Sequence, residues 1–311
     1  MIVYITNRVL QGLVVLAGVS FIVFALMHLT PGNPAEVMLS EFGASAEDLR
    51  RLRDQLGIDQ HWTLQYRDFL AGAVRGDLGR SLFTRRPVAE QIISALPSTL
   101  ALTSSAIGIA LVVGMPLGIV SALRHRTWID SVSMVMSLLG VAMPVFWIAI
   151  LLILIFSINL GWFPATGGVG AGSMVLPAIA LGLGAAGLIA RLVRSSMLEV
   201  LRAEYIVTAR SKGLREAPVI VRHALRNALI PLVTIVGLQI GNLLSGAVVV
   251  ETVFARQGIG SMLIKGIVQK DFPLVQGLIL FIAVVYIGIN IAIDILYGVI
   301  DPRVRTGAGA R

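Results

Sequence analysis

Residues 99–123 read TLALTSSAIGIALVVGMPLGIVSAL and contain no charged side chain. A helix needs about 20 apolar residues to cross the hydrocarbon core of a bilayer, and this stretch is long enough. Because a backbone in lipid must satisfy its own hydrogen bonds, we expect an all-α membrane protein with six transmembrane helices. The other five apolar stretches are Val9–Leu29, Ser131–Leu160, Val175–Ala190, Leu232–Val250 and Leu278–Val299.

The composition excludes an ordinary soluble protein. Of 311 residues, 56% are hydrophobic and only 14% are charged, with a mean hydropathy of +0.87. The net charge of +8 would suggest a nucleic-acid partner in a soluble chain, but no basic stripe with interleaved aromatic residues is present, so we expect none. The chain has no cysteine, which excludes disulfides, thiolate metal sites and cysteine nucleophiles.

Lysine and arginine are unevenly distributed over the short loops. Fourteen of them lie before residue 9, between residues 123 and 131, between 191 and 226, and after 300. Only three lie between residues 251 and 277. Because basic residues accumulate on the cytoplasmic side, this asymmetry predicts that both termini are cytoplasmic.

The segment between the first two apolar stretches is predicted to be external and partly helical. Its eight basic and nine acidic residues nearly cancel. Ser45-Ala-Glu-Asp48 has the pattern of a capping box, with Gly57 as the stop of the helix that it opens. A second amphipathic helical segment runs through Trp62, Tyr66 and Phe69. The glycines of GDLG, residues 76–79, then predict a turn, as does Arg86-Pro87.

These patterns divide the chain into three parts. Residues 1–30 hold the N-terminal segment and the first transmembrane helix. Residues 31–98 form the external segment. Residues 99–311 form the remaining helices together with a cytoplasmic loop at 195–230.

The sequence GLGAAG at residues 182–187 matches the dinucleotide fingerprint G-x-G-x-x-G, which requires a preceding strand and a following helix. Here the motif lies inside an apolar stretch and is followed by Arg191 and Arg194. We interpret it as a small-residue surface for close helix packing. The same interpretation applies to Gly114 and Gly118, and to Gly237, Gly241 and Ser245.

No pattern predicts catalysis, and we expect no enzyme activity and no cofactor or metal site on the chain. The four histidines lack metal-ligand spacing, and no G-x-x-x-x-G-K-[ST] motif is present to cradle ATP. Ionisable residues in the apolar stretches are few, with Glu251 ending the fifth and Asp294 late in the sixth. A carrier driven by protons or sodium usually needs more buried carboxylates than this.

Uncharged polar residues are commoner inside the apolar stretches. Gln239, Asn242 and Ser245 share helical spacing, and Asn290 lies in the middle of the sixth stretch. Two interpretations remain open for these side chains: hydrogen bonding between helices, or lining of a translocation path.

The most informative segment is EYIVTARSKGL, residues 204–214, followed by RHALRNALIP, residues 222–231. Its first half is predicted to be a helix that stops at Gly213, because glycine tolerates a left-handed backbone. Pro218 can open a second helix that ends before Pro231. Cations alternate with apolar residues in both arms, which predicts an amphipathic helical hairpin against the membrane. Ordinary positive-inside charge is the alternative, but it does not account for paired helices.

Two parts of this segment, TARSKGL at 208–214 and HALRNALIP at 223–231, resemble the cytoplasmic coupling loop of ABC-type importer permeases, especially the dipeptide/oligopeptide/nickel branch. The long external segment is similar to that of the first (B-type) of the two permease subunits. Further similar motifs follow in order along the chain: LTPGNP (29–34), GDLGRS (76–81), PV (87–88), LPST (96–99), GVAMPVFW (140–147) and DPR (301–303).

The resemblance implies a permease subunit of a bacterial or archaeal cytoplasmic membrane. Its implied partners are a second homologous permease, two ATPase subunits that carry ATP and Mg²⁺, and an external binding protein. The implied cargo is a short peptide, with nickel, glutathione or short oligosaccharides as alternatives. An ion-gradient-driven transporter and a receptor scaffold are the alternatives from other classes. The implied ATPase-docking residues are Ala209, Arg210, Ser211, Lys212, Gly213, Leu214, Arg222 and Arg226.

The coupling loop departs from the general importer pattern at one place. That pattern begins Glu-Ala-Ala six residues before the loop glycine, whereas this chain has Val207-Thr208-Ala209. The contact that the first acidic residue makes in other families is therefore not carried over. Glu204 is the nearest acidic substitute.

Overall fold

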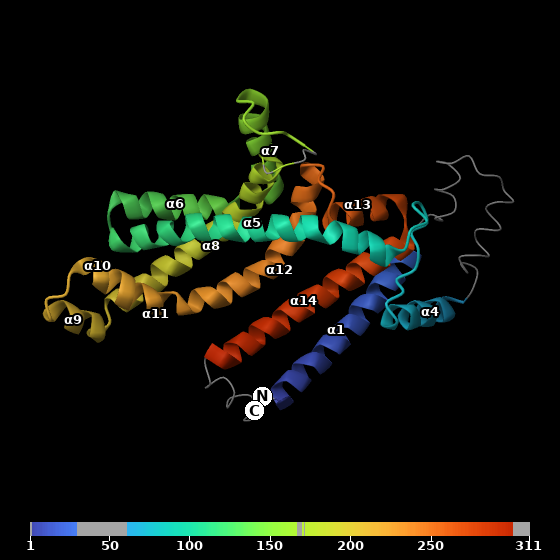
Figure 1. Ribbon diagram of the computed structural model, residues 1–311, viewed down its shortest axis with the longest axis horizontal. Helices are drawn as coiled ribbons and strands as arrows, with labels where there is room; N and C mark the ends of the chain where they lie inside the picture. Colours follow the sequence, from blue (N-terminus) through green and yellow to red (C-terminus); the bar gives the residue numbers. More distant parts are fainter. Residues whose placement is uncertain (1, 30–60, 167–169, 171, 301–311) are drawn as a thin grey trace. The chain divides into compact units, whose positions relative to one another are not determined.

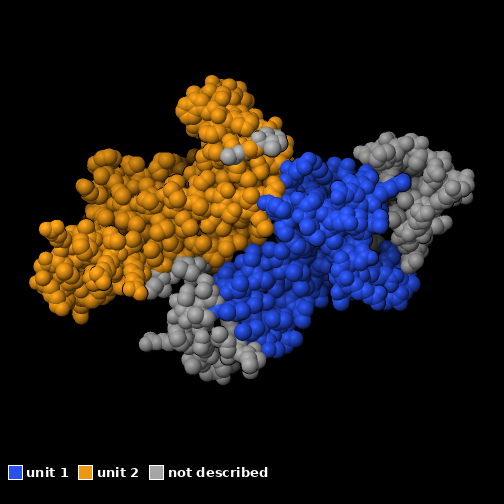
Figure 2. All heavy atoms as spheres, in the orientation of Figure 1, with its two compact units in different colours: residues 1–97, 257–311 blue, residues 98–256 orange. Residues whose placement is uncertain are grey.

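The computed structural model describes residues 2–29, 61–166, 170 and 172–300. These residues are predominantly helical, and in them the only β-type pairing is an isolated bridge between Arg80 and Pro87. Figure 1 shows the helices with their labels. The chain forms two compact units, Met1–Pro97 with Gln257–Arg311 and Ser98–Arg256, which are coloured separately in Figure 2.

In the first unit, α1 (Ile2–Leu29) and α14 (Phe272–Ile300) lie side by side (Figure 1). Asp294 is one of the few ionisable residues expected in the sixth stretch. Its Oδ2 forms an ion pair with Arg8 Nε at 3.0 Å. A charge in an apolar helix is costly unless it is paired, so this contact explains how Asp294 is tolerated.

The end of the segment 31–98 is helical, as its amphipathic pattern predicts. Helix α4 (Trp62–Val74) places the Tyr66 ring against Phe21 and Phe24 of α1, with its hydroxyl 3.0 Å from Ser20 Oγ. The capping box at residues 45–48 and the helix expected after it lie outside the described residues.

The turns expected at residues 76–79 and 86–87 are present. Gly76 and Gly79 have φ angles of +81° and +78°, which glycine adopts without a Cβ penalty. The buried Asp271 anchors the following loop, because its carboxylate accepts hydrogen bonds from Ser81 Oγ at 2.5 Å and Leu82 N at 3.1 Å. Helix α13 (Ile259–Gln269), which the sequence analysis did not predict, precedes this anchor.

In the second unit, α8 (Gly172–Leu201) packs against α5 (Val88–Leu123) and α6 (Trp128–Ala142). The small residues account for the closeness of these helices. A Cβ added at Gly182 would lie 2.7 Å from Ala106 O on α5, and one at Gly187 would collide with Ser137 O on α6. The interpretation of GLGAAG as a packing surface is therefore confirmed.

The third apolar stretch is not one straight helix. Helix α6 ends at Ala142, and α7 (Val145–Leu152) continues as the π-helical η1 (Ile153–Asn159) at an angle of 105° to it. Pro144 causes the break, since proline has no N–H and forces the residue before it out of helical geometry; Met143 has ψ of 131°. The helix expected over Ser131–Leu160 is therefore divided into two parts at Pro144.

Among the residues that the structure describes, five helices are long and apolar enough to cross a membrane, or six if the bent pair counts as one span. Five of the six expected stretches each fall within one helix, and the third is divided among α6, α7 and η1; several helices are longer than predicted. α5 begins at Val88 rather than Thr99, and α8 continues past Arg191 and Arg194. Helix α12 (Ile230–Val253) contains the fifth stretch.

Candidate functional site

The basic segment forms a helical hairpin that continues directly from α8. After Leu201, a turn with hydrogen bonds from Arg202 N to Glu199 O and Ala203 N to Val200 O redirects the chain. Helix α9 (Glu204–Ser211) then forms the first arm of the hairpin. The first arm thus follows α8 with only two residues between them.

Gly213 makes the turn between the two arms. Its φ is +75°, in the left-handed region that favours glycine, as the sequence predicts. The N–H of Gly213 donates to Arg210 O at 2.9 Å and that of Lys212 donates to Thr208 O at 3.1 Å, which closes the end of α9.

The second arm begins at Glu216, two residues before the expected start at Pro218. It consists of α10 (Glu216–Pro218), the π-helical η2 (Val219–Leu225) and α11 (Arg226–Ala228). It ends before Pro231, as predicted. α12 then begins at Ile230, so the hairpin is connected to a long membrane helix at each end.

The inner side of the hairpin is apolar. Ile206 and Ala209 of the first arm belong to the same buried cluster as Val219 and Ala224 of the second arm. Asn227 Nδ2 also donates a hydrogen bond of 2.9 Å to Tyr205 Oη, which ties the arms together at their open end. Because Ala209 is buried, it supports the hairpin from within; the remaining expected docking residues are exposed on its surface.

An ion pair spans the turn. Arg210 donates to Glu216 from Nη2 at 2.5 Å and from Nε at 3.2 Å. This hydrogen bonding lowers the pKa of the Glu216 carboxyl and raises the pKa of Arg210. Both side chains are exposed, so the pair contributes little to stability. It does, however, compensate the charge of Arg210, which was expected to take part in ATPase docking. Glu216 was not singled out in the sequence analysis.

The exposed outer side of the hairpin remains basic after Arg210 is neutralised. Leu214 adds a 45% exposed apolar side chain at the turn. We call Leu214 and the exposed cations of the hairpin the hairpin surface. Its cations are Lys212, Arg215, Arg222 and Arg226.

The polar residues expected near a translocation path fall into two groups. On α12, Asn242 Nδ2 donates to Gln239 Oε1 at 2.8 Å, and Ser245 Oγ lies 3.4 Å from Gly241 O. Asn290 lies on α14 of the other unit and donates to Tyr286 O. Each of these bonds stays within one helix, which leaves the path assignment as a prediction.

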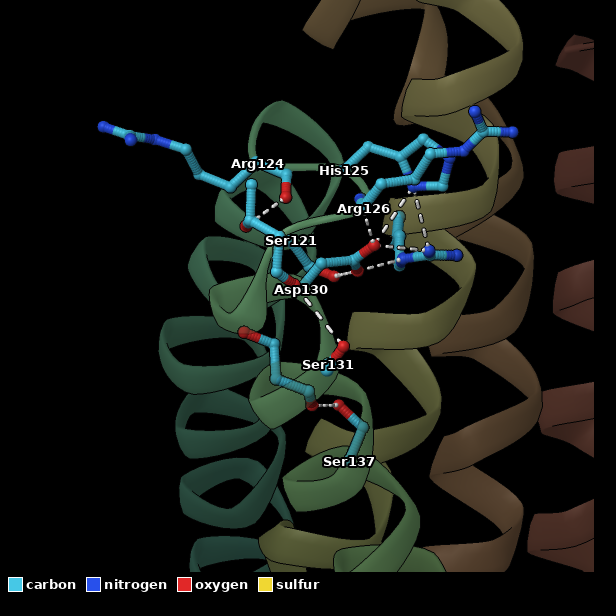
Figure 3. Close-up of polar contacts among 10 residues, drawn as sticks. Ser121, Arg124, His125, Arg126, Asp130, Ser131 and Ser137 are labelled. Atoms are coloured by element: carbon cyan, nitrogen blue, oxygen red, sulfur yellow. Dashed lines mark hydrogen bonds and ion pairs between the residues drawn. The ribbon is translucent and has the colours of Figure 1, made fainter.

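A polar cluster that the sequence analysis missed joins the helices α5, α6 and α8 (Figure 3). Asp130 of α6 accepts hydrogen bonds from Arg194 Nε of α8 at 2.7 Å and Nη2 at 2.8 Å. Ser121 Oγ of α5 donates to the same carboxylate at 2.6 Å, and Arg126 N donates to it at 3.1 Å. His125 Nδ1 lies 3.0 Å from Asp130 Oδ2. We call this cluster the Asp130–Arg194 clamp.

The clamp is shielded from solvent, with the Asp130 side chain only 7% exposed and that of Arg194 24% exposed. Two-fold donation from a guanidinium to a carboxylate is among the strongest and most directional contacts in proteins. Removing one partner of such a buried pair costs about 3–5 kcal/mol, because the other charge is left uncompensated. The sequence signal was the acidic Asp130 just before an apolar stretch, but its partner lies 64 residues further on.

Glu251 has a comparable role deep in the same unit. It is fully buried and accepts a hydrogen bond of 2.5 Å from Thr99 Oγ1, joining α12 to α5. Among the described residues, no group of three or more His, Cys, Asp or Glu side chains could hold a metal ion.

Comparison with known proteins shows the family to which this chain belongs. Residues 114–306 match the family model described as "Binding-protein-dependent transport system inner membrane component", and residues 1–103 match the model of its N-terminal region. The chain is 40% identical to the dipeptide transport system permease protein DppB of Alkalihalophilus pseudofirmus, covering 98% of this chain and 100% of the relative. It is also 40% identical to the glutathione transport system permease protein GsiC of Escherichia coli, covering 98% and 99%.

Solved structures agree on the fold. The inward-facing MetNI methionine ABC transporter aligns with a TM-score of 0.59, covering 68% of this chain and 96% of that chain at 18% identity. At this identity the likeness concerns the fold alone. From the two family models, which together cover most of its length, the chain belongs to the family of binding-protein-dependent transport system inner membrane components.

Proposed function

We propose that this chain forms half of the translocation path of an ATP-driven importer and receives its driving force through the hairpin surface. The observation that carries the proposal is a closed hairpin with exposed cations, continuous with long membrane helices at both ends. A second homologous permease subunit would complete the path. Two ATPase subunits would hold ATP and Mg²⁺, and an external binding protein would deliver the substrate.

The proposed orientation places both termini and the hairpin surface in the cytoplasm, with residues 31–98 outside. Its support is the excess of lysine and arginine in the loops on the hairpin side of the membrane. ATPase subunits act in the cytoplasm, so this orientation brings them to the hairpin.

The proposed substrate class is a short peptide. Relatives of nearly full length are named for transport of dipeptides and of glutathione, which is itself a tripeptide. The polar side chains of α12, Gln239, Asn242 and Ser245, are uncharged and could hydrogen-bond to peptide groups without selecting one side-chain charge. Nickel and short oligosaccharides are the alternative cargoes.

The proposed function is tested by reconstituting the chain in vesicles with its permease partner, ATPase subunits and binding protein. We expect uptake of labelled dipeptides and tripeptides only when ATP and the binding protein are both present. Uptake driven by an ion gradient without nucleotide would instead indicate a secondary transporter. Binding of the external protein with no uptake under any condition would indicate a receptor scaffold.

Reversing charge on the hairpin surface should weaken ATPase docking. In the variant Lys212→Glu/Arg222→Glu/Arg226→Glu, three exposed cations become anions, and we expect at least a ten-fold loss of co-purified ATPase subunits. Each exposed pair is worth up to about 1 kcal/mol, and about 1.4 kcal/mol already gives a factor of ten. Since salt screens exposed charges, the amount of ATPase subunits that co-purify with the native chain should fall as the ionic strength rises.

The matched control is Arg75→Glu/Arg80→Glu/Arg86→Glu, which changes the net charge equally in the external segment, where these arginines are exposed. It should leave ATPase co-purification unchanged. An equal loss in both variants would show that the effect comes from overall charge, and the hairpin surface would lose its assignment.

A further inference from the structure

The Asp130–Arg194 clamp lies in a packed part of α8, between the fully buried Val193 and Met197 and shortly before the hairpin. The contacts before it are apolar and close: a Cβ at Gly118 of α5 would lie 2.5 Å from Ala190 O of α8. Arg194 is one turn further along α8, and the hairpin begins ten residues after it, at Glu204. The clamp is thus the polar contact that joins α8 to α5 and α6 next to the hairpin.

The clamp has more hydrogen bonds than are needed to compensate the charge of Arg194, and their geometry is suited to transmitting a movement of α8 to α5 and α6. A lone buried arginine would need one carboxylate, whereas here Ser121 of α5 and the N–H of Arg126 also hold that carboxylate. The two parallel hydrogen bonds from Nε and Nη2 fix both the distance and the direction of α8 relative to α6. This arrangement adds a directional polar contact to the close apolar packing of α8.

We propose that Asp130 and Arg194 are positioning residues for the coupling step: they make α5, α6 and the end of α8 move as one body when the hairpin is displaced. This inference rests on the proposed function, in which ATPase subunits displace the hairpin. Without the clamp, the end of α8 would be held by the packing of residues such as Val193 and Met197, and less of the hairpin displacement would reach α5 and α6.

The inference is tested by the amount of peptide taken up per ATP hydrolysed in the reconstituted transporter. Asp130→Asn keeps the shape and the hydrogen bond from Ser121 but removes the charge. We expect ATP hydrolysis and ATPase co-purification to stay near the native level, while uptake per ATP falls about ten-fold. Arg194→Lys keeps the charge but cannot donate two parallel hydrogen bonds, so uptake per ATP should fall about three-fold in this variant.

The double variant Asp130→Asn/Arg194→Gln separates coupling from folding. It leaves no uncompensated charge, so thermal stability should recover relative to Asp130→Asn, as expected when both partners of a buried pair are removed. Uptake per ATP should stay as low as in Asp130→Asn, because the same joint is missing. If uptake per ATP returns to the native value together with stability, the clamp is only structural and the inference is overturned.

Arg124→Gln is the matched control, since it removes an exposed arginine next to the same turn without touching the carboxylate. It should keep the native uptake per ATP, and a loss equal to that of Asp130→Asn would overturn the inference. Uptake by the native chain distinguishes failure of the proposed function from failure of the clamp inference. If it shows no ATP-driven uptake, the proposed function fails; if it does, and the clamp variants keep the native ratio, only the clamp inference fails.

Discussion

Gly118→Ala is expected to destabilise the folded chain by about 3 kcal/mol, the upper part of the usual range for overpacking. The added Cβ would lie 2.5 Å from Ala190 O and 2.9 Å from Val193 Cβ. Because a backbone oxygen cannot rotate away as a side chain can, α5 and α8 must separate. A loss of this size should lower the midpoint of thermal unfolding in detergent by about 5 °C.

Gly108→Ala is the matched control on the same helix. An added Cβ at Gly108 meets nothing within 4 Å, and alanine is a better helix former than glycine by about 1 kcal/mol. This variant should therefore be as stable as the native chain or slightly more stable. If both variants shift the midpoint equally, close helix packing is not what Gly118 provides.

The apolar stretches could be predicted from the sequence because lipid permits few structures. Apart from the break at Met143 and Pro144, the long stretches are helical, and GLGAAG packs as small residues do in membranes. The break at Pro144 was not predicted because apolar residues continue on both sides of it, so hydropathy alone does not reveal the bend. The extension of α8 past Arg191 was missed for the opposite reason: charge ended the apolar pattern but not the helix.

The same contrast holds for the hairpin. The turn at Gly213 and the burial of Ile206 follow from local pattern, and both could be predicted. The pairing of Arg210 with Glu216 could not, because an exposed acidic residue in a basic segment has several cations within reach. Asp130 and Arg194 are further apart still in sequence, and only the packing of α6 on α8 brings them together.

Gly213→Val should uncouple ATP hydrolysis from uptake while the chain still accumulates in the membrane. A β-branched residue at a φ of +75° carries backbone strain of about 1–3 kcal/mol. A Cβ there meets no atom within 4 Å, so the strain comes from the backbone alone. The turn would relax to a negative φ and pull Glu216 away from Arg210. We expect uptake per ATP to fall at least ten-fold, with unchanged membrane abundance because Gly213 lies outside the helix pack.

Gly213→Asn is the control that separates backbone conformation from side-chain bulk. Asparagine is similar in size to valine but tolerates the left-handed region, so this variant should retain most of the uptake. Equal losses in both variants would mean that the site excludes any side chain, as it would if a partner's backbone approached the turn closely. Full uptake in Gly213→Val would contradict the proposal that the hairpin moves as a rigid unit, because a relaxed turn could not transmit displacement from one arm to the other.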